Sequence, residues 1–367
     1  MILDRRRFLA RASLAAGAAT VAAAHAPNVI AQPKIQWRMS TTWTPSLDML
    51  QGSAERLGKV VEALSGGRFK IDVFPGGQIV PPLDCFDAAS RGTIEAFMGA
   101  PYYWPEKEPA VQWFSTVPFG MDPAGMTSWY YQGDGLSLWE EAYAAFNLIP
   151  RPGPAIAPQM AGWFRKKINT IGDYRGLKMR IPGLGGKVVA RAGGAVVLTP
   201  AAEIYAALER GVIDASEWIG PYDDMKLGLH KTARYYYYPG WHEPGTVTGF
   251  GFNRKAYEAL PVDLQRTVDH AAEVVQVYGL TDYHVKNAAA LARLRTEFKA
   301  ITVLRLPTPV LRDLKKLAAA VVREESEKTP MGRKVHASFT KFQALVGPWD
   351  SLAEGAYHQF VAGEGHA

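Results

Sequence analysis

Three polar residues lie next to short apolar runs that have the pattern of β-strands. Arg180 belongs to the predicted strand 178–182, Glu217 follows a predicted strand that ends at Ser216, and Gln159 precedes the run 160–164. A guanidinium binds a carboxylate through two parallel hydrogen bonds, which a lysine cannot reproduce. A carboxylate can hold a hard cation or position a ligand directly, and a glutamine offers a neutral carbonyl oxygen. These residue types suit a site that holds a small acid.

The same three residues also have ordinary structural explanations. Arg180 could form a surface or interdomain ion pair, Glu217 could cap the N-terminus of a helix, and Gln159 could be a polar residue of a strand. The residues alone leave both explanations open for each position.

Aromatic residues near predicted strand ends present a similar choice. Tyr102-Tyr103-Trp104 follows the predicted strand 96–98, where the rings could wall a small pocket and supply a phenol hydrogen bond, or pack in the core. Glu243 is a further acid, in an aromatic loop that begins with the four tyrosines 235–238. Such a tyrosine run is typical of sheet and core.

Motifs for catalysis are absent from the sequence. There is no HExxH pair and no GxSxG elbow, and the histidines are scattered. The run 183–187 (GLGGK) is not a phosphate loop, because Ile181 replaces its first glycine and Val188 replaces its Ser or Thr. We expect a flexible strand-to-helix turn there. The sequence favours a binding protein, with an exported enzyme acting on a small organic acid as the alternative.

The elements around these residues predict an α/β fold. Residues 35–39 alternate as a strand, residues 47–64 have helical periodicity, and residues 69–73 alternate again. A strand–helix–strand sequence implies a parallel pair. Residues 86–96 are then echoed by residues 205–215: each is a helix closed by Arg-Gly and followed by a strand entered through Ile-acid-Ala.

This echo predicts two α/β lobes of related topology, with chance similarity as the alternative. Two facing lobes leave a ligand cleft at the carboxyl ends of their parallel strands. Helices are predicted over 256–299, 309–328 and 349–361. We expect four segments: a signal peptide, a first lobe, the core of a second lobe, and a crossover strand with a long connecting helix and C-terminal helices that complete both lobes. Their ranges are 1–31, 32–157, 158–245 and 246–367.

Composition excludes several classes of protein. The 367 residues are 48% hydrophobic and 21% charged, which excludes a disordered chain. The single cysteine, Cys85, excludes an internal disulfide framework and a thiolate zinc cluster. Beyond the N-terminal segment, no apolar run approaches the roughly 20 residues that a membrane span needs.

The N-terminal segment has the pattern of a twin-arginine export signal. Paired arginines precede Phe8-Leu9, and an alanine-rich stretch, residues 12–26, follows. Cleavage after Ala31 is preferred, and a site after Ala24 is the alternative. Residues 1–31 carry four arginines and one aspartate, so removing them lowers the net charge from +6 to +3. The smaller charge weakens a nucleic-acid-binding interpretation and fits a periplasmic protein.

Longer strings of the sequence resemble the solute-binding subunits of tripartite ATP-independent periplasmic (TRAP) transporters, DctP type, and within them the branch that binds α-keto acids and related monocarboxylates. The resemblance covers nearly all of the chain after the signal. The matching stretches are 54–57 (AERL), 65–68 (SGGR), 86–88 (FDA), 100–104 (APYYW), 117–120 (VPFG), 162–166 (GWFRK), 177–186 (LKMRIPGLGG), 214–222 (DASEWIGPY), 235–245 and 253–261.

The resemblance implies a two-lobed periplasmic-binding-protein fold that closes around its ligand. It implies that Arg180 pairs with the carboxylate of a 2-oxoacid such as pyruvate, or of lactate, and that Tyr102 or Tyr103 closes the pocket. It also implies a bound Na⁺ or Ca²⁺ bridging ligand and protein. The implied partners are TRAP membrane subunits and a second copy of the chain, paired through the C-terminal helices. The implied cation ligands are Gln159, Glu217, the Trp218 main chain and Glu243.

Overall fold

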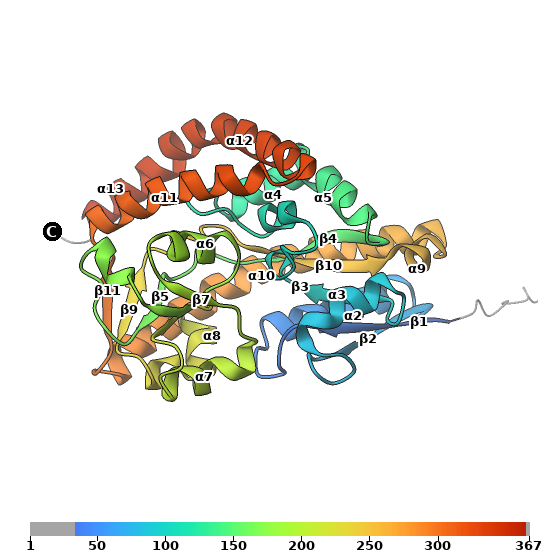
Figure 1. The fold of residues 1–367 in the computed structure, drawn as a ribbon. Helices are drawn as coiled ribbons and strands as arrows, with labels where there is room; N and C mark the ends of the chain where they lie inside the picture. The colour runs from blue at the N-terminus through green and yellow to red at the C-terminus, as the bar shows by residue number, and fades with distance from the viewer. Residues whose placement is uncertain (1–33, 365–367) are drawn as a thin grey trace, which may run out of the picture. The chain divides into compact units, whose positions relative to one another are not determined.

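The computed structural model describes residues 34–364, so the predicted signal peptide lies outside the described residues. From Gln36 onward the chain forms one unit that contains two β-sheets flanked by helices (Figure 1). Among the described helices, none combines the length and apolar character that a membrane crossing requires.

The first sheet has five strands in the order β2-β1-β3-β10-β4. Strand β1 runs parallel to β3, whereas β10 is antiparallel to both β3 and β4. The alternation predicted for residues 35–39 appears as β1, in which Trp37 and Met39 are buried. The strands are β1 (Ile35–Thr41), β2 (Phe69–Phe74), β3 (Ala96–Gly99), β4 (Leu148–Ala155) and β10 (Val247–Asn253).

The second sheet has six strands in the order β11-β9-β5-β8-β6-β7. Strand β6 is parallel to β7 and to β8, and β5 is antiparallel to β8 and β9. The tyrosine run forms β9, as its composition indicated. The strands are β5 (Gly162–Phe164), β6 (Lys178–Arg180), β7 (Ala195–Val197), β8 (Ala215–Ser216), β9 (Tyr235–Tyr238) and β11 (Thr302–Arg305).

The predicted echo occupies equivalent places in the two sheets. The order β1-α2-β2-α3-β3 in the first lobe corresponds to β6-α6-β7-α7-β8 in the second. Gly92 (φ +73°) and Gly211 (φ +71°) both adopt the left-handed conformation that ends a helix and favours glycine. The two-lobed α/β prediction is confirmed. The helices are α2 (Leu50–Leu64), α3 (Cys85–Ser90), α6 (Gly183–Arg191) and α7 (Ala201–Glu209).

The glycine-rich run 183–187 is helical, so the prediction of a flexible turn was wrong. Helix α6 begins at Gly183, directly after Pro182. The glycines reflect close approach of neighbouring groups: a Cβ on Gly185 would lie 2.8 Å from the Cβ of His242. Gly183 has φ +57° and lies against Tyr102 of the first lobe.

Long helices connect and cover the two lobes. Helix α10 packs against β4 and α2 of the first lobe and against α8, which follows β8. Helices α11 and α12 lie side by side along one edge of the molecule (Figure 1). The bounds are α4 (Pro123–Gln132), α5 (Gly135–Ala144), α8 (Pro221–Lys226), α9 (Arg254–Glu258), α10 (Val262–Glu297), α11 (Thr308–Ser326), α12 (Pro330–Asp350) and α13 (Ala356–Glu364).

The long C-terminal helices are present, but the sequence did not predict α12. After residue 328 a helix was expected over 349–361 only, whereas helical structure runs from Pro330 to Glu364 through a π-helical turn, Ser351–Gly355. Thr329 caps α12 by accepting a bond from the Gly332 N–H at 2.9 Å, and Pro330 occupies the first turn. This Thr-Pro start is a signal in the sequence that could have placed the helix.

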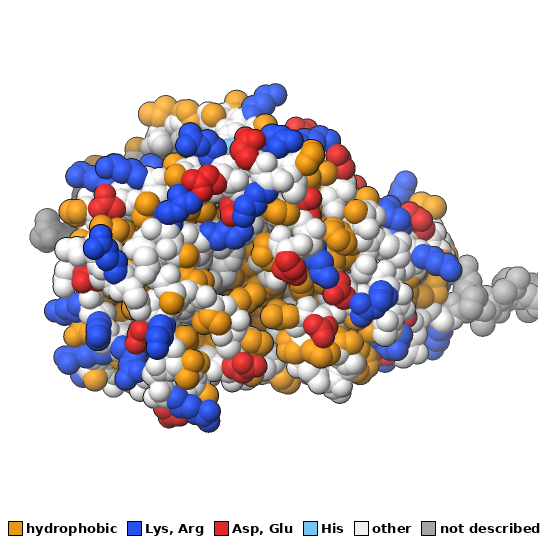
Figure 2. Space-filling view, in the orientation of Figure 1, with side chains coloured by type: hydrophobic (Ala, Val, Ile, Leu, Met, Phe, Trp, Pro, Cys, Tyr) orange, Lys and Arg blue, Asp and Glu red, His pale blue; other side chains and the backbone are white. Residues whose placement is uncertain are grey.

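The surface mixes charges of both signs. Figure 2 shows lysines and arginines interspersed with acids over the face seen there. Hydrophobic side chains gather around its centre, between the parts of the molecule built on the two sheets. The predicted division of the chain into segments 32–157, 158–245 and 246–367 stays a prediction.

Candidate functional site

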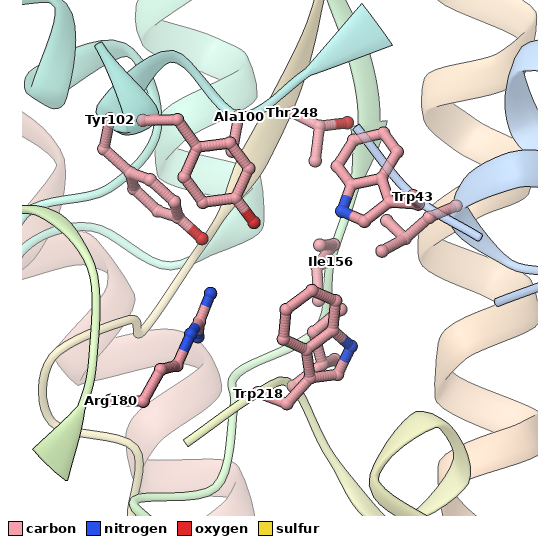
Figure 3. Close-up of a pocket in the computed structure, with 10 residues that line it drawn as sticks. Trp43, Ala100, Tyr102, Ile156, Arg180, Trp218 and Thr248 are labelled. Carbon is pink, nitrogen blue, oxygen red and sulfur yellow. The ribbon is translucent and has the colours of Figure 1, made fainter. Parts of the chain in front are cut away.

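A small cavity lies where the strand ends of the two lobes meet (Figure 3). Its first wall follows β1 and β3, and its second wall consists of the end of β6 and the residues after β8. Ile156 and Thr248, from the segments that cross between the lobes, complete the lining. The first wall consists of Trp43, Leu50, Ala100, Tyr102 and Tyr103, and the second wall consists of Arg180, Trp218 and Ile219. Glu217 lies behind the second wall, in contact with Arg180.

Arg180 is the cation of the second wall. It is the last residue of β6, its side chain is 2% exposed, and it lines the cavity. Its Nη1 donates to Glu217 Oε1 at 2.5 Å and to the Glu217 carbonyl at 3.1 Å, and its Cζ lies 4.9 Å from the centre of the Trp218 ring. Burial alone would lower the pKa of Arg180, but the charge of Glu217 opposes this and raises it.

The observed geometry agrees in part with both explanations offered for Arg180, an ion pair and a ligand-binding role. It does form an ion pair, although the pair is buried within the second lobe and is neither on the surface nor between the lobes. It also faces the cavity, where Figure 3 shows the guanidinium and the Tyr102 side chain directed toward the same space. Glu217 is not a helix cap, because helix α8 begins four residues later, at Pro221.

Two buried carboxylates and an imidazole form a cluster behind the second wall. One potential ligand atom from each of Glu217, His242 and Glu243 lies within 4.8 Å of the others. His242 Nε2 is 3.4 Å from Glu217 Oε2. Burial raises the pKa of Glu217 to about 7 against the opposing effect of Arg180, and burial together with the Glu217 charge raises the pKa of Glu243 to about 7. Burial lowers the pKa of His242 to about 4, so the imidazole is neutral near pH 7.

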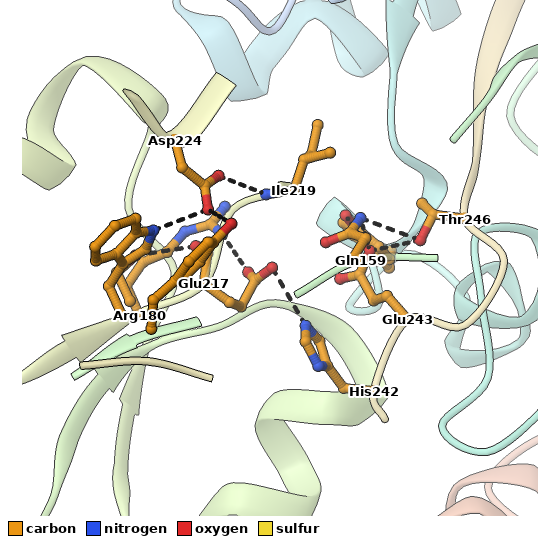
Figure 4. Close-up of polar contacts among 12 residues, drawn as sticks. Gln159, Arg180, Glu217, Ile219, Asp224, His242, Glu243 and Thr246 are labelled. Carbon is orange, nitrogen blue, oxygen red and sulfur yellow. Dashed lines mark hydrogen bonds and ion pairs between the residues drawn. The ribbon is translucent and has the colours of Figure 1, made fainter. Parts of the chain in front are cut away.

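Gln159 and Glu243 are held in fixed orientations (Figure 4). Glu243 Oε2 accepts bonds from Gln159 Nε2 at 2.6 Å, from the Thr246 hydroxyl at 2.6 Å and from the Tyr102 hydroxyl at 3.3 Å. The Gln159 amide also donates to Thr246 Oγ1 at 3.2 Å. Because the amide nitrogen is committed in this way, the carbonyl oxygen faces away from these partners, and it is buried without a hydrogen-bond partner.

This donor set fits a hard cation. An orphaned buried carbonyl oxygen costs free energy unless something positive or a donor meets it. Carboxylate and carbonyl oxygens are the ligands that Ca²⁺ prefers. Burial raises the pKa of both carboxylates, and the charge of Glu217 raises that of Glu243 further, so a bound positive charge would stabilise their ionised forms. Gln159, Glu217 and Glu243 are thus placed to hold such an ion.

The tyrosines of the first wall are buried hydrogen-bonding groups. Tyr102 and Tyr103 form a short 3₁₀ turn directly after β3, and their rings meet edge to face at 5.1 Å. Burial, followed by the charge of Glu243, raises the pKa of Tyr102, so its hydroxyl stays protonated and acts as a donor. The alternative of pure core packing does not account for the Tyr102 contact with Glu243.

The structure brings the predicted site residues into one region. Arg180, Tyr102, Tyr103 and Trp218 line the cavity, and Gln159, Glu217 and Glu243 adjoin it through direct contacts. The indole of Trp218 faces the cavity, while the role of its main chain stays a prediction.

Several residues of the site were missed by sequence reasoning. The adjacent pair His242-Glu243 was a usable signal for the cluster, but the histidines were dismissed as scattered. The apolar lining residues carry no chemical signal in the sequence. The missed residues are His242, Thr246, Trp43, Leu50, Ala100, Ile156, Ile219 and Thr248.

Known proteins resemble this chain over most of its length. The family model "Bacterial extracellular solute-binding protein, family 7" (DctP) matches residues 39–329. A monocarboxylate 2-oxoacid-binding periplasmic protein of Nostoc sp. is 38% identical over 330 residues, 90% of each chain.

Solved structures give the same result. A TRAP transporter solute-binding protein of Bordetella bronchiseptica, described as a mixed-occupancy dimer with calcium and picolinate, has a TM-score of 0.88 and 37% identity, covering 90% of this chain and 98% of its own. One of Pseudoalteromonas atlantica with sodium and pyruvate has a TM-score of 0.86 and 36% identity, covering 89% and 99%. The chain belongs to the bacterial extracellular solute-binding proteins of family 7, the DctP family of TRAP transporters.

Proposed function

We propose that this protein captures a small 2-oxo monocarboxylate, such as pyruvate, together with a Na⁺ or Ca²⁺ ion, and delivers it to the membrane subunits of a TRAP transporter. The observation that carries the proposal is the convergence of one guanidinium, a phenol donor and an oxygen-rich cluster on a single small cavity. The related proteins that bind pyruvate or picolinate with sodium or calcium support it.

The residues would divide the recognition of such a ligand among them. Arg180 would pair with the carboxylate, and the Tyr102 hydroxyl would exchange its bond to Glu243 for one to an oxygen of the ligand. Trp43 and Trp218 would exclude water on the apolar sides. A cation held by Gln159, Glu217 and Glu243 would supply positive charge to the ligand's carboxylate and keto oxygens.

Closure of the two lobes over the ligand would follow from this division. The first wall and the second wall belong to different lobes, so a ligand that contacts both favours the closed arrangement. The family description names solute binding, which favours this function over an exported enzyme.

The test is isothermal titration of pyruvate into the purified chain after chelation, and then with Ca²⁺ or Na⁺ restored. We expect binding in the presence of the cation and a clear loss of affinity without it. Pyruvate bound equally well after exhaustive chelation would reject the cation, and failure to bind any 2-oxoacid under either condition would reject the function. A thermal-shift screen of small organic acids then ranks ligands, because tight ligands raise the melting temperature.

We also infer that two copies pair through their C-terminal helices. Helix α12 and the π-helical turn expose large apolar side chains: Leu345 is 72% exposed, Trp349 71% and Leu352 78%. Such a patch marks an interaction surface. Multi-angle light scattering should give a dimer for the full chain and a monomer for the double variant Trp349→Glu, Leu352→Glu. A monomeric wild-type chain at micromolar concentration would contradict the pairing.

Export through the twin-arginine pathway is part of the same proposal. Its basis is the sequence of residues 1–31, which lie outside the described residues. Replacing Arg5, Arg6 and Arg7 together with lysine should leave the unprocessed chain in the cytoplasm. An unchanged amount of processed protein in the periplasmic fraction would reject this route.

A further inference from the structure

Asp224 is a buried carboxylate that does not line the cavity but is bonded to the segment that forms the second wall. It lies in the first turn of α8 and is fully buried. Its Oδ1 accepts a hydrogen bond from the Ile219 N–H at 3.1 Å (Figure 4). Ile219 follows Trp218 in the chain, and both residues line the cavity. The Asp224 carboxylate therefore binds the N–H of the peptide that joins two lining residues.

The second oxygen of Asp224 ties this segment to the sheet. Oδ2 accepts bonds from Trp163 Nε1 at 2.9 Å and from the Tyr236 hydroxyl at 2.7 Å. These two residues belong to the neighbouring strands β5 and β9, and their rings stack with centroids 4.0 Å apart. Asp224 therefore links the two stacked rings of the sheet to the Ile219 amide.

Other bonds hold the segment beside the one to Asp224. The Ile219 carbonyl accepts from the Met160 N–H at 3.0 Å, next to Gln159, and the Glu217 N–H donates to the Arg180 carbonyl at 3.2 Å. Arg180 Nη1 and the Ser216 hydroxyl donate to the Glu217 carbonyl at 3.1 Å and 3.0 Å. Strand β8 ends at Ser216 and α8 begins at Pro221, so the residues between them lie outside regular secondary structure. Within this turn, the Ile219 N–H donates to the side chain of Asp224.

We propose that Asp224 is a positioning residue, which holds the turn from Glu217 to Ile219 in the place where its groups meet the ligand and the cation. The proposal rests on the proposed function for its affinity readout. The position requires a carboxylate because three donors approach it from two sides. An asparagine has one acceptor oxygen for these donors and would direct an N–H₂ group at one of them.

Asp223 provides a matched control. It is the preceding residue, in the same turn of α8, and is also fully buried. Its Oδ2 accepts only from the Tyr283 hydroxyl on α10, at 2.8 Å, and its Oδ1 has no hydrogen-bond partner. Asp223→Asn thus makes the same chemical change at a buried site that does not touch the second wall.

The experiment compares Asp224→Asn with Asp223→Asn in two measurements. Titration of pyruvate in saturating Ca²⁺ should show an affinity about tenfold weaker for Asp224→Asn, the size of one hydrogen bond to a charged group, and within about twofold of wild type for Asp223→Asn. Amide hydrogen exchange of a peptide containing Ile219 should be faster in Asp224→Asn alone. If the two substitutions only destabilised the fold, both variants would have lower melting temperatures, and they would not differ from each other in affinity or in exchange at Ile219.

Each outcome of these measurements either supports or overturns the positioning role of Asp224. Unchanged affinity and exchange in Asp224→Asn, or equal losses in both variants, would overturn the positioning role. If Asp224→Asn does not fold, exchange of the wild-type Ile219 amide decides: slow exchange supports the bond, and exchange at the rate of an exposed amide refutes it. If the wild-type chain binds no pyruvate, the proposed function fails, while the exchange comparison still tests Asp224.

Discussion

The strand ends of the two lobes hold equivalent places in their sheets but carry different chemistry. Strand β3 is followed by Ala100 and then by Tyr102, whereas β8 is followed at once by Glu217. Their parallel neighbours differ in the same way: β1 leads to Trp43, and β6 ends in Arg180. One backbone topology thus supports an uncharged wall and a charged wall.

Buried charge is accordingly confined to one side of the cavity. Among the described residues, every buried acid lies after residue 200, and none lies in the first wall. The first wall contributes apolar surface and phenol donors, which cost little to desolvate. The second wall contributes charges that are stable in a dry site only while they are paired. The two walls should therefore respond differently to substitution. The buried acids are Glu217, Asp223, Asp224, Glu243 and Glu325.

The largest effect on ligand binding should come from the second wall. Arg180→Ala is expected to weaken pyruvate binding at least tenfold, or by about 1.4 kcal/mol, because it removes the ligand's counter-ion and leaves Glu217 buried without its partner. Tyr102→Phe, in the first wall, should cost about threefold, since it removes one hydrogen bond and leaves no unpaired charge. Isothermal titration measures both. Equal losses of affinity in the two variants would mean that both walls bind the charged group of the ligand. An unchanged affinity in Arg180→Ala would show that Arg180 does not bind the ligand.

A second contrast concerns the pH dependence of stability. Burial raises the pKa of Asp223 to about 7, above the value near 4 that an unfolded chain has. Between these values the folded chain holds a proton that the unfolded chain releases, so this group's contribution to the free energy of unfolding falls as pH rises from 4 to 7. Asp223→Asn keeps a neutral group at every pH. Its stability relative to wild type should therefore rise by about 2 kcal/mol from pH 5 to pH 8 in chelated buffer.

Asp263 gives a control of opposite sign for this measurement. Its exposed carboxylate pairs with Arg68, which lowers its pKa. Asp263→Asn should therefore lose a little stability relative to wild type as pH rises through the acid range. Urea unfolding at each pH measures the differences. If the difference in the free energy of unfolding between wild type and Asp223→Asn does not change with pH, burial does not raise the pKa of Asp223.

Sequence patterns were sufficient for several of the elements and for the strand-end residues. Apolar alternation and helical spacing report burial on one face, which is a local property, so β1, α2 and the echoed α3 and α7 could be predicted. Arg180 and Glu217 could be selected because ligands of α/β sheets gather at the carboxyl ends of parallel strands. Helix α12 was missed because its Thr-Pro start was not used as a cap signal.

The contacts that complete the site could not be predicted in this way. The bonds of Asp224 to Trp163 and Tyr236, and of Gln159 to Glu243, join residues that are distant in the chain, and nothing in their local sequence specifies the partner. The ion pair of Arg180 with Glu217 is a similar case: each residue was selected separately, and their contact depends on the pairing of β6 with β8.

This ion pair leads to a smaller but more discriminating effect than the loss of Arg180. Glu217 Oε1 occupies Arg180 Nη1, so a carboxylate that binds the guanidinium through Nη1 and Nη2 must displace Glu217, and a cation that attracts Glu217 would assist this. In chelated buffer, Glu217→Gln should therefore bind pyruvate about fivefold tighter than wild type does. Glu243→Gln removes an equal charge from the same cluster without touching Arg180, and its cation-free affinity should stay within about twofold. Equal gains of affinity in both variants would indicate general repulsion between the carboxylates and the ligand. A loss of affinity in Glu217→Gln would mean that Glu217 does not compete with the ligand for Arg180 and acts only as a cation ligand. Because both carboxylates stand behind the charged wall, the difference between them measures what the Arg180 contact alone contributes.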